Sequence, residues 1–183
     1  MNASDELATA RLHGHRAGAG DLQDLARLYR DRQVLDTLSP GGEPIPDAVI
    51  HERMQAAIRH WDDHGFGIWF FRGTDDGEFA GRAGLRVVDI EGARETELLY
   101  AFMPESWGRG IATEASYAIT EQAFGRLRLE SLVAYTLHGN LGSRRVMEKL
   151  GFAYERDIVH AGLDHVLYRR SRSDWTSRER SSP

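Results

Sequence analysis

The residues with the clearest chemical potential form a short segment of small side chains in the second half of the chain. It reads Glu105-Ser106-Trp107-Gly108-Arg109-Gly110-Ile111-Ala112-Thr113-Glu114-Ala115. The segment lies between an expected strand and an expected helix. Such a turn exposes successive backbone N–H groups, and the helix adds its own unpaired N–H groups and the positive end of its dipole. The segment therefore predicts an anion cradle for a phosphate or pyrophosphate, with Arg109 as an added charged contact.

Two widespread phosphate-binding motifs do not fit this segment. No Gly-Lys-Ser/Thr follows the glycines, so the segment is not a P-loop. The third glycine of a dinucleotide fingerprint is missing, and the preceding strand is not the first of a βαβ unit. For this fragment alone, a tight strand–helix turn without a ligand is the alternative interpretation.

A second segment, which follows the next expected strand, adds specificity. It begins at His138, contains Asn140-Leu141-Gly142-Ser143, and ends with Lys149-Leu150-Gly151-Phe152. Together the two segments resemble the GNAT superfamily of acyl-CoA-dependent N-acetyltransferases, and more narrowly its ribosomal-protein (RimJ/RimL-type) branch. That branch shows Trp-Gly-x-Gly-x-Ala-Thr-Glu-Ala and then Asn-x-x-Ser-x-x-x-x-x-Lys-Leu-Gly-Phe. The chain matches both patterns, and Ala10-Arg11-Leu12 is similar to the Thr-x-Arg-Leu opening of the branch.

The resemblance implies that acetyl-CoA is the co-substrate and that no metal is needed. It implies a pyrophosphate loop made of Trp107, Gly108, Arg109, Gly110, Ile111, Ala112 and Thr113. The pantetheine arm is expected in a gap between two splayed strands, beside the backbone of Phe102 and Met103. Asn140, Ser143 and Arg144 complete the expected cofactor contacts. Asn140 is also suited to cap the helix that begins after it, and the two roles are compatible.

Acetyl transfer to an amine requires a neutral amine, a polarised carbonyl and a proton for the departing CoA thiolate. Glu97 is the expected base, because it matches the Glu of the family's Glu-Ile-Gly-Tyr pattern; a cross-strand partner for an arginine is the alternative. Ser143 is the expected donor to the thiolate. Many GNAT enzymes place a Tyr one turn further along, where this chain has Met147. Tyr100 and Tyr135 are alternative donors by their strand positions.

The hydrophobic periodicity predicts the elements that must position these side chains. One expected helix begins after Asp21. Three further helices are expected at residues 47–64, 113–124 and 141–150. Expected strands cover residues 12–16, 68–72, 79–88, 95–103, 131–137, 152–157 and 164–170. An antiparallel meander that turns into strand–helix repeats indicates an α/β protein. With the resemblance, we expect a GNAT (acyl-CoA N-acyltransferase) fold: a central mixed, mostly antiparallel sheet of about six or seven strands, helices on both faces, and a splayed strand pair.

Length and composition exclude several other classes. A chain of 183 residues predicts one domain, which we place at 8–172 between a flexible N-terminal tail (1–7) and a polar C-terminal tail (173–183). The absence of cysteine excludes disulfides, thiolate zinc sites and a Cys nucleophile. A net charge of −5 argues against a nucleic-acid partner. No apolar run is long enough for a membrane span, and no secretory signal pattern is present, so we expect a cytoplasmic protein.

The acceptor amine is the open question at this stage. A protein N-terminal α-amine is one candidate, and a small amine, antibiotic or peptide is the other. A non-catalytic acyl-CoA-binding module is a further interpretation, and a homodimer is a candidate assembly. We expect the acceptor to be selected by the loops 35–50 and 61–66. Their acidic residues Asp36, Glu43 and Asp47 favour a cationic acceptor slightly.

Overall fold

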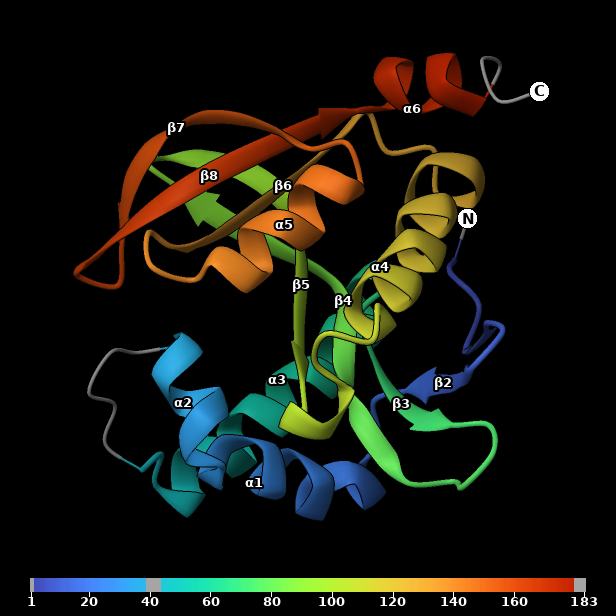
Figure 1. Cartoon of the computed structure of the whole chain (residues 1–183), viewed down its shortest axis with the longest axis vertical. Coiled ribbons are helices and arrows are strands. Elements are labelled where there is room, and N and C mark those ends of the chain that lie inside the picture. Colours follow the sequence, from blue (N-terminus) through green and yellow to red (C-terminus); the bar gives the residue numbers. More distant parts are fainter. Residues whose placement is uncertain (1, 39–43, 180–183) are drawn as a thin grey trace.

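The computed structural model describes residues 2–38 and 44–179. Eight strands form one mixed sheet in the order β1-β2-β3-β4-β5-β6-β8-β7 (Figure 1). The strands are β1 (Glu6–Ala8), β2 (Leu12–Arg16), β3 (Ile68–Gly73), β4 (Phe79–Ile90), β5 (Ala93–Phe102), β6 (Ser131–Leu137), β7 (Ala153–His160) and β8 (Leu163–Ser171). The expected α/β fold with a mixed sheet is confirmed, and the strand beyond the expected seven is the three-residue β1.

Six α-helices flank the sheet within the described residues. They are α1 (Leu22–Arg30), α2 (Arg32–Leu38), α3 (Asp47–His64), α4 (Ile111–Glu121), α5 (Leu141–Lys149) and α6 (Arg172–Glu179). Helix α4 continues into a π-helical turn at Gln122–Arg126. Helix α2 was not expected, because its seven residues fall partly in a segment that the sequence analysis assigned to a substrate loop.

Helices α1 and α5 lie on opposite faces of the sheet, as two contacts show. The phenol of Tyr29 in α1 accepts a hydrogen bond from Arg82 of β4, and Arg82 is paired in register with Ala101 of β5. The neighbouring residue of β5, Tyr100, bonds to Ser143 of α5. Since successive side chains of a strand point to opposite faces, the two helices cover opposite sides of β5.

Strands β5 and β6 separate from one another within the sheet. Strand β5 pairs with β4 along its whole length, from Ile90↔Ala93 to Gly81↔Phe102. Its parallel pairing with β6 consists of the single register pair Glu97↔Val133. Strand β6 is paired with β8 along its whole length, whereas β5 continues past this point beside β4 and away from β6 (Figure 1). The result is the expected splayed pair, which forms a V that opens toward Phe102.

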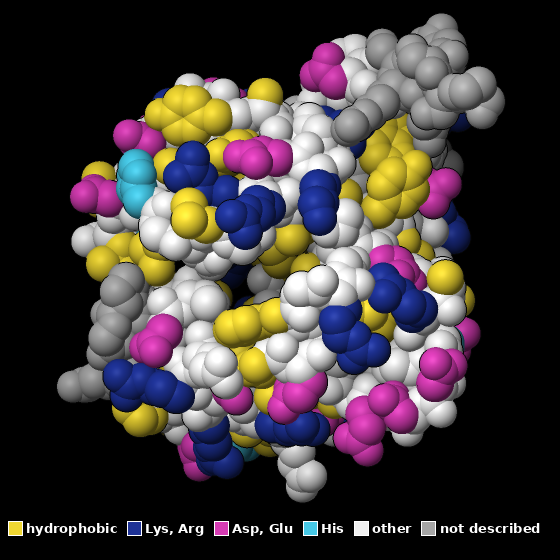
Figure 2. All heavy atoms as spheres, viewed as in Figure 1, with side chains coloured by type: hydrophobic (Ala, Val, Ile, Leu, Met, Phe, Trp, Pro, Cys, Tyr) yellow, Lys and Arg dark blue, Asp and Glu magenta, His cyan; other side chains and the backbone are white. Residues whose placement is uncertain are grey.

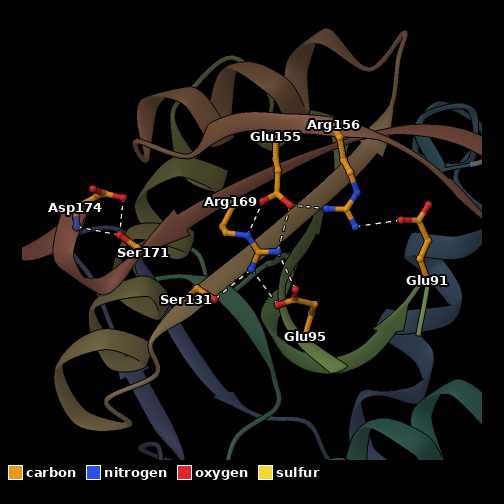
Figure 3. Close-up of polar contacts among 8 residues, drawn as sticks. All are labelled: Glu91, Glu95, Ser131, Glu155, Arg156, Arg169, Ser171 and Asp174. Carbon is orange, nitrogen blue, oxygen red and sulfur yellow. Dashed lines mark hydrogen bonds and ion pairs between the residues drawn. The ribbon is translucent and has the colours of Figure 1, made fainter. Parts of the chain in front are cut away.

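A polar network holds the closed end of the V (Figure 3). Arg169 of β8 donates to Glu95 of β5 (Nη2 to Oε1, 2.7 Å), to the Ser131 hydroxyl of β6 (3.2 Å) and to Glu155 of β7 (Nε to Oε2, 2.5 Å). The hydrogen bonds to Glu95 and Glu155 raise the pKa of Arg169. Because Val133 pairs with both Glu97 and Arg169, this Arg169 clamp lies at the point where β5 and β6 part.

The described parts of the two expected tails, residues 2–7 and 173–179, pack against the domain, while residues 1 and 180–183 lie outside the described residues. Near the N-terminus, β1 pairs with β2, Leu7 is buried, and the Ala3 N–H donates to the Gly65 carbonyl (2.7 Å). Near the C-terminus, Trp175 of α6 is buried against Phe124 and Tyr117. Short segments with one or two apolar residues give almost no periodic signal, which is why the sequence did not predict β1 or α6.

None of the helices within residues 2–38 and 44–179 combines the length and the apolar character that crossing a membrane requires.

Candidate active site

The glycine segment forms a tight loop between β5 and α4, as its sequence predicts. A 3-10 turn at Pro104–Ser106 leaves β5, and α4 begins at Ile111. Gly108 (φ 70°) and Gly110 (φ 78°) both adopt the left-handed conformation. A Cβ at Gly108 would meet no atom within 4 Å, and one at Gly110 would lie 3.6 Å from Arg11. The glycines are therefore needed for the backbone conformation, and the first N–H groups of α4 lack partners within the helix, as at any helix N-terminus.

An ion pair that the sequence analysis missed supports this loop from the N-terminal segment. Glu114 in the first turn of α4 accepts from the Thr9 hydroxyl (2.6 Å), the Arg11 N–H (2.9 Å) and the Arg11 Nε (2.7 Å). Arg11 also donates to the carbonyl oxygen of Arg109 (2.9 Å). Burial opposes the ionisation of Glu114, but the hydrogen bonds from Thr9 and Arg11 outweigh it and lower its pKa. The Glu114 carboxylate and the Arg11 guanidinium, which come from distant parts of the sequence, therefore hold the loop in place.

A depression of about 550 Å³ lies against the start of α4. Its lining includes Thr9, Gly110, Thr113, Glu114 and Lys149. Of the expected pyrophosphate residues, Gly110 and Thr113 contribute to it directly. Ile111 is buried in the core, so that it can meet a ligand only through its backbone.

A second opening separates the half of the molecule that carries α5 from the half that carries α1 and α2 (Figure 2). Dark-blue basic side chains gather over α5 beside this opening, and α5 contributes Arg144, Arg145 and Lys149. A basic rim beside a glycine loop at a helix N-terminus suits a phosphorylated ligand.

Two backbone groups expected to meet the pantetheine arm are occupied within the protein. The Trp107 indole Nε1 donates to the Phe102 carbonyl (2.8 Å), and the Met103 N–H donates to the Ala80 carbonyl (2.8 Å). The Trp107 side chain, 41% exposed, therefore lies beside the end of β5 rather than in the core. A pantetheine contact to Phe102 or Met103 stays a prediction. The Met103 N–H is already used, whereas a carbonyl oxygen such as that of Phe102 can accept a second hydrogen bond.

The V is bridged by a hydrogen-bonded pair of hydroxyls. Tyr100 of β5 donates to the carbonyl oxygen of Ser143 in α5 (2.9 Å), and its phenol oxygen lies 3.0 Å from the Ser143 Oγ. Burial raises the pKa of Tyr100, so that its phenol stays protonated at neutral pH. Both of these expected proton donors thus meet at one place between β5 and α5. The third, Tyr135, lies elsewhere, near Arg86 and His160.

Asn140 and Arg144 also have structural partners. The Asn140 Oδ1 accepts from the Ser143 N–H (3.0 Å), which is the expected N-cap of α5. Its Nδ2 donates to the Thr37 carbonyl (3.3 Å), which links α5 to α2. The Arg144 Nε donates to the Tyr168 phenol (3.2 Å). The cap role of Asn140 is therefore present, and the cofactor roles of both residues stay predictions.

Glu97 is buried and paired with an arginine, as the alternative interpretation held. Its Oε2 accepts from the Nη2 (2.6 Å) and the Nε (3.0 Å) of Arg86, its register partner on β4. Arg86 also donates to the Tyr135 phenol (3.2 Å), which lies 3.2 Å from the His160 Nε2. Since Glu97 and Tyr100 are three residues apart on one strand, they lie on opposite faces of β5. Within the described part of the chain, no three His, Asp or Glu side chains cluster closely enough to hold a metal ion.

A glycine loop at a helix N-terminus, beside two parallel strands that part, defines a class of α/β proteins that bind an acyl-CoA and carry its thioester into the sheet. The chain belongs to the GNAT family: residues 11–153 match the model of the acetyltransferase (GNAT) domain. It is therefore an acetyl-CoA-dependent N-acetyltransferase.

The chain is also similar to individual curated proteins and solved structures. YkkB of Bacillus subtilis is 32% identical over 93% of this chain and 98% of its own. A GNAT-family acetyltransferase structure from Bordetella pertussis superimposes with a TM-score of 0.81 at 24% identity, over 92% of this chain and 100% of the other. The ribosomal L7/L12 α-N-protein acetyltransferase RimL, solved with coenzyme A, superimposes with a TM-score of 0.75 at 15% identity, over 91% and 97% of the two chains. These structural likenesses show the fold.

Proposed function

We propose that the protein transfers the acetyl group of acetyl-CoA directly to a primary amine within a ternary complex, and that a protein N-terminal α-amine is the first acceptor to test. The acceptor assignment rests on the Trp107–Ala115 and Asn140–Phe152 matches to the ribosomal-protein branch. Likeness to RimL at 15% identity supports it only through the fold.

The opposite faces of β5 suit the two substrates. The glycine loop and α5 lie on the Tyr100 side, where the phosphates and pantetheine would approach. Glu97 faces the other side together with Arg86, where α1 and α3 lie. An amine arriving from that side would reach the thioester across the open part of the V. Direct attack requires this kind of arrangement, with both reactants held at contact distance.

The proton for the CoA thiolate would come from the Tyr100–Ser143 pair. The Tyr100 phenol, which donates to the Ser143 carbonyl oxygen and lies 3.0 Å from the Ser143 Oγ, would hold this side chain in place. Ser143 would give its hydroxyl proton to the thiolate and regain a proton from solvent. This pair substitutes for the Tyr of other family members, whose position is held here by the buried Met147. On the other face, Glu97 would accept the amine proton, with Arg86 fixing the orientation of its carboxylate.

The single observation that carries the proposal is the V between β5 and β6, with hydroxyls at its side and a glycine loop at its mouth. The test is CoA release from acetyl-CoA in the presence of peptides and small amines, with mass spectrometry of the acetylated product. Transfer to at least one amine is expected. Tight acetyl-CoA binding without transfer to any amine would favour the non-catalytic binding module instead.

A further inference from the structure

Three elements bring uncompensated positive charge together on the Glu97 face of the sheet. Tyr29 of α1 is buried, and Arg82 of β4 donates to its phenol (Nη2 to Oη, 2.6 Å) while its guanidinium lies 5.3 Å from the ring centre. The guanidinium of Arg53 in α3 lies 5.0 Å from the same ring. We call Tyr29, Arg53 and Arg82 the arginine–tyrosine cluster.

The described residues supply no counterion for this cluster. Fifteen ion pairs within 4.0 Å occur in the described part of the chain, and none includes Arg53 or Arg82. The Arg82 Nε is buried and has no hydrogen-bond partner there. Burial alone would raise the pKa of Tyr29, but the charges of Arg82 and Arg53 outweigh it and lower the pKa. Two guanidinium groups held together around a phenol retain a net positive charge that an anion would neutralise.

The cluster lies beside the open part of the V. Arg82 and Arg86 are four residues apart on β4, so they face the same side, with Cα atoms about 13 Å apart at roughly 3.3 Å per residue. Their register partners on β5 are Ala101 and Glu97. Ala101 belongs to the part of β5 that β6 has already left. A compact ligand could therefore extend from Glu97 to the cluster.

The acids that favoured a cationic acceptor at first have other partners. Asp36 lies 3.3 Å from the Nε of Arg32, and Asp47 lies 2.6 Å from the Nη2 of Arg30. Glu43 lies outside the described residues. The charged groups that contact Tyr29 on this side are therefore the guanidinium groups of Arg53 and Arg82.

We propose that the acceptor amine carries an anionic group several bonds away, and that Arg53 and Arg82 bind this group while the amine lies at Glu97. A carboxylate or a phosphate has the required chemistry, because both accept paired hydrogen bonds from guanidinium groups. The anion could belong to a small amino acid or peptide, or to an acidic residue near a protein N-terminus. This inference rests on the proposed acetyltransferase function and narrows its substrate class.

The test compares acceptors with and without an anionic group. One pair is glycylglycine and its C-terminal amide. A second pair is two heptapeptides that differ in Asp or Asn at their second position, and a third is phosphoethanolamine and ethanolamine. The measured quantity is kcat/KM for acetyl transfer by the wild type, Arg53→Gln, Arg82→Gln and Arg82→Lys. Arg59→Gln is the matched control, because Arg59 is exposed on the same helix, six residues beyond Arg53.

The wild type should prefer the anionic member of at least one pair by about tenfold or more, the effect of one charged hydrogen-bonding partner. Arg53→Gln and Arg82→Gln should remove this preference, Arg82→Lys should keep part of it, and Arg59→Gln should leave it unchanged. The acceptor pair that shows this preference in the wild type identifies the source of the anion. Comparing each variant's ratio with that of the wild type cancels differences in amine basicity. If Arg82→Gln does not fold, the acceptor preference of Arg53→Gln tests the inference by itself, because Arg53 is exposed and its replacement should leave the fold intact.

Acetylation of neutral amines without any preference for anions would overturn the inference and leave the acetyltransferase function standing. Persistence of the preference in Arg53→Gln would overturn it as well. If no amine is acetylated, calorimetry of glycylglycine binding to the CoA-saturated protein replaces the kinetics. Binding that is at least tenfold weaker in Arg53→Gln than in Arg59→Gln would then support the inference, and equal or undetectable binding would reject it.

Discussion

Arg11 and Glu114 are 103 residues apart in the chain, yet the Arg11 Nη2 and the Glu114 Oε2 lie 2.6 Å apart. This ion pair joins the segment before β2 to the first turn of α4, and Arg11 also reaches the backbone of the glycine loop. The N-terminal segment is therefore part of the support of the cofactor loop.

Replacing Glu114 by Gln should lower the free energy of unfolding by about 1–3 kcal/mol at pH 7, the range for hydrogen bonds to a charged group. In the folded protein the pKa of Glu114 lies below its ordinary value of 4.5. Its stabilising effect is consequently complete above pH 4.5 and is lost as the pH falls through the folded pKa. Urea unfolding between pH 3 and 7 measures this. Glu121→Gln, on the same helix and exposed, is the control, and an equal pH dependence in both variants would contradict the prediction.

Replacing Gly110 by Val should weaken CoA binding at least about tenfold. A side chain costs roughly 1–2 kcal/mol in the left-handed conformation, and relaxing it would turn the loop N–H groups away from the phosphates. Calorimetry with CoA gives the affinity. Gly77→Val carries the same strain (φ 68°) in the β3–β4 turn, with no atom within 4 Å of its Cβ, and should bind CoA normally. Unchanged affinity in Gly110→Val would remove the loop from the binding site.

Loss of either bridging hydroxyl should slow the reaction without preventing CoA binding. We expect Ser143→Ala and Tyr100→Phe each to lower kcat about 10–100-fold, at the low end of general acid effects because a CoA thiolate leaves readily. If the two hydroxyls act as one relay, the double variant should be little slower than the slower single one. Tyr154→Phe, which removes an exposed phenol bonded to Asp157, should keep the wild-type rate. Full additivity would argue for two independent roles.

The role of Glu97 can be separated from its ion pair with Arg86. If Glu97 accepts the amine proton, Glu97→Gln should lower kcat about 10²–10⁴-fold at neutral pH and regain rate as the pH rises, since solvent then deprotonates the amine. The double variant Glu97→Gln/Arg86→Gln should be equally slow, while Arg86→Gln alone should retain more activity. If the Glu97–Arg86 ion pair has only a structural role, both single variants should lose stability, and the double variant should recover both stability and kcat.

The order of elements could be predicted from sequence because it depends on local signals. Residues 131–137 form β6 as expected, and α3 begins at Asp47 and is ended by Gly65, as expected from its periodicity and its glycine. Segments that depend on long-range pairing could not be found this way. Strand β1 has only three residues, and its one buried side chain, Leu7, forms no pattern.

The candidate site was predictable only to the level of its motifs. The loop and the Asn140 cap follow from local sequence, and both are present. The partners of the functional side chains are not local. The residues next to Glu97 in the chain do not identify Arg86 as its partner. The Tyr100 and Ser143 hydroxyls meet only because α5 folds back against β5. Such contacts arise from topology, so a single sequence does not reveal them.

The parting of β5 and β6 divides the hydrogen-bonded framework into two unequal parts. Strands β1 to β5 share continuous ladders, and so do β6, β8 and β7, but a single register pair joins the two groups through their backbones. Side-chain contacts add to it: the Arg169 clamp, the Arg86–Tyr135 hydrogen bond and the Arg156–Glu91 ion pair. Cooperative opening units tend to follow such boundaries. We therefore expect native-state hydrogen exchange to detect β6–β8 as a separate foldon with its own opening free energy. Breaking the clamp with Arg169→Ala should accelerate exchange in that foldon, while the amides of β3 and β4 keep their protection.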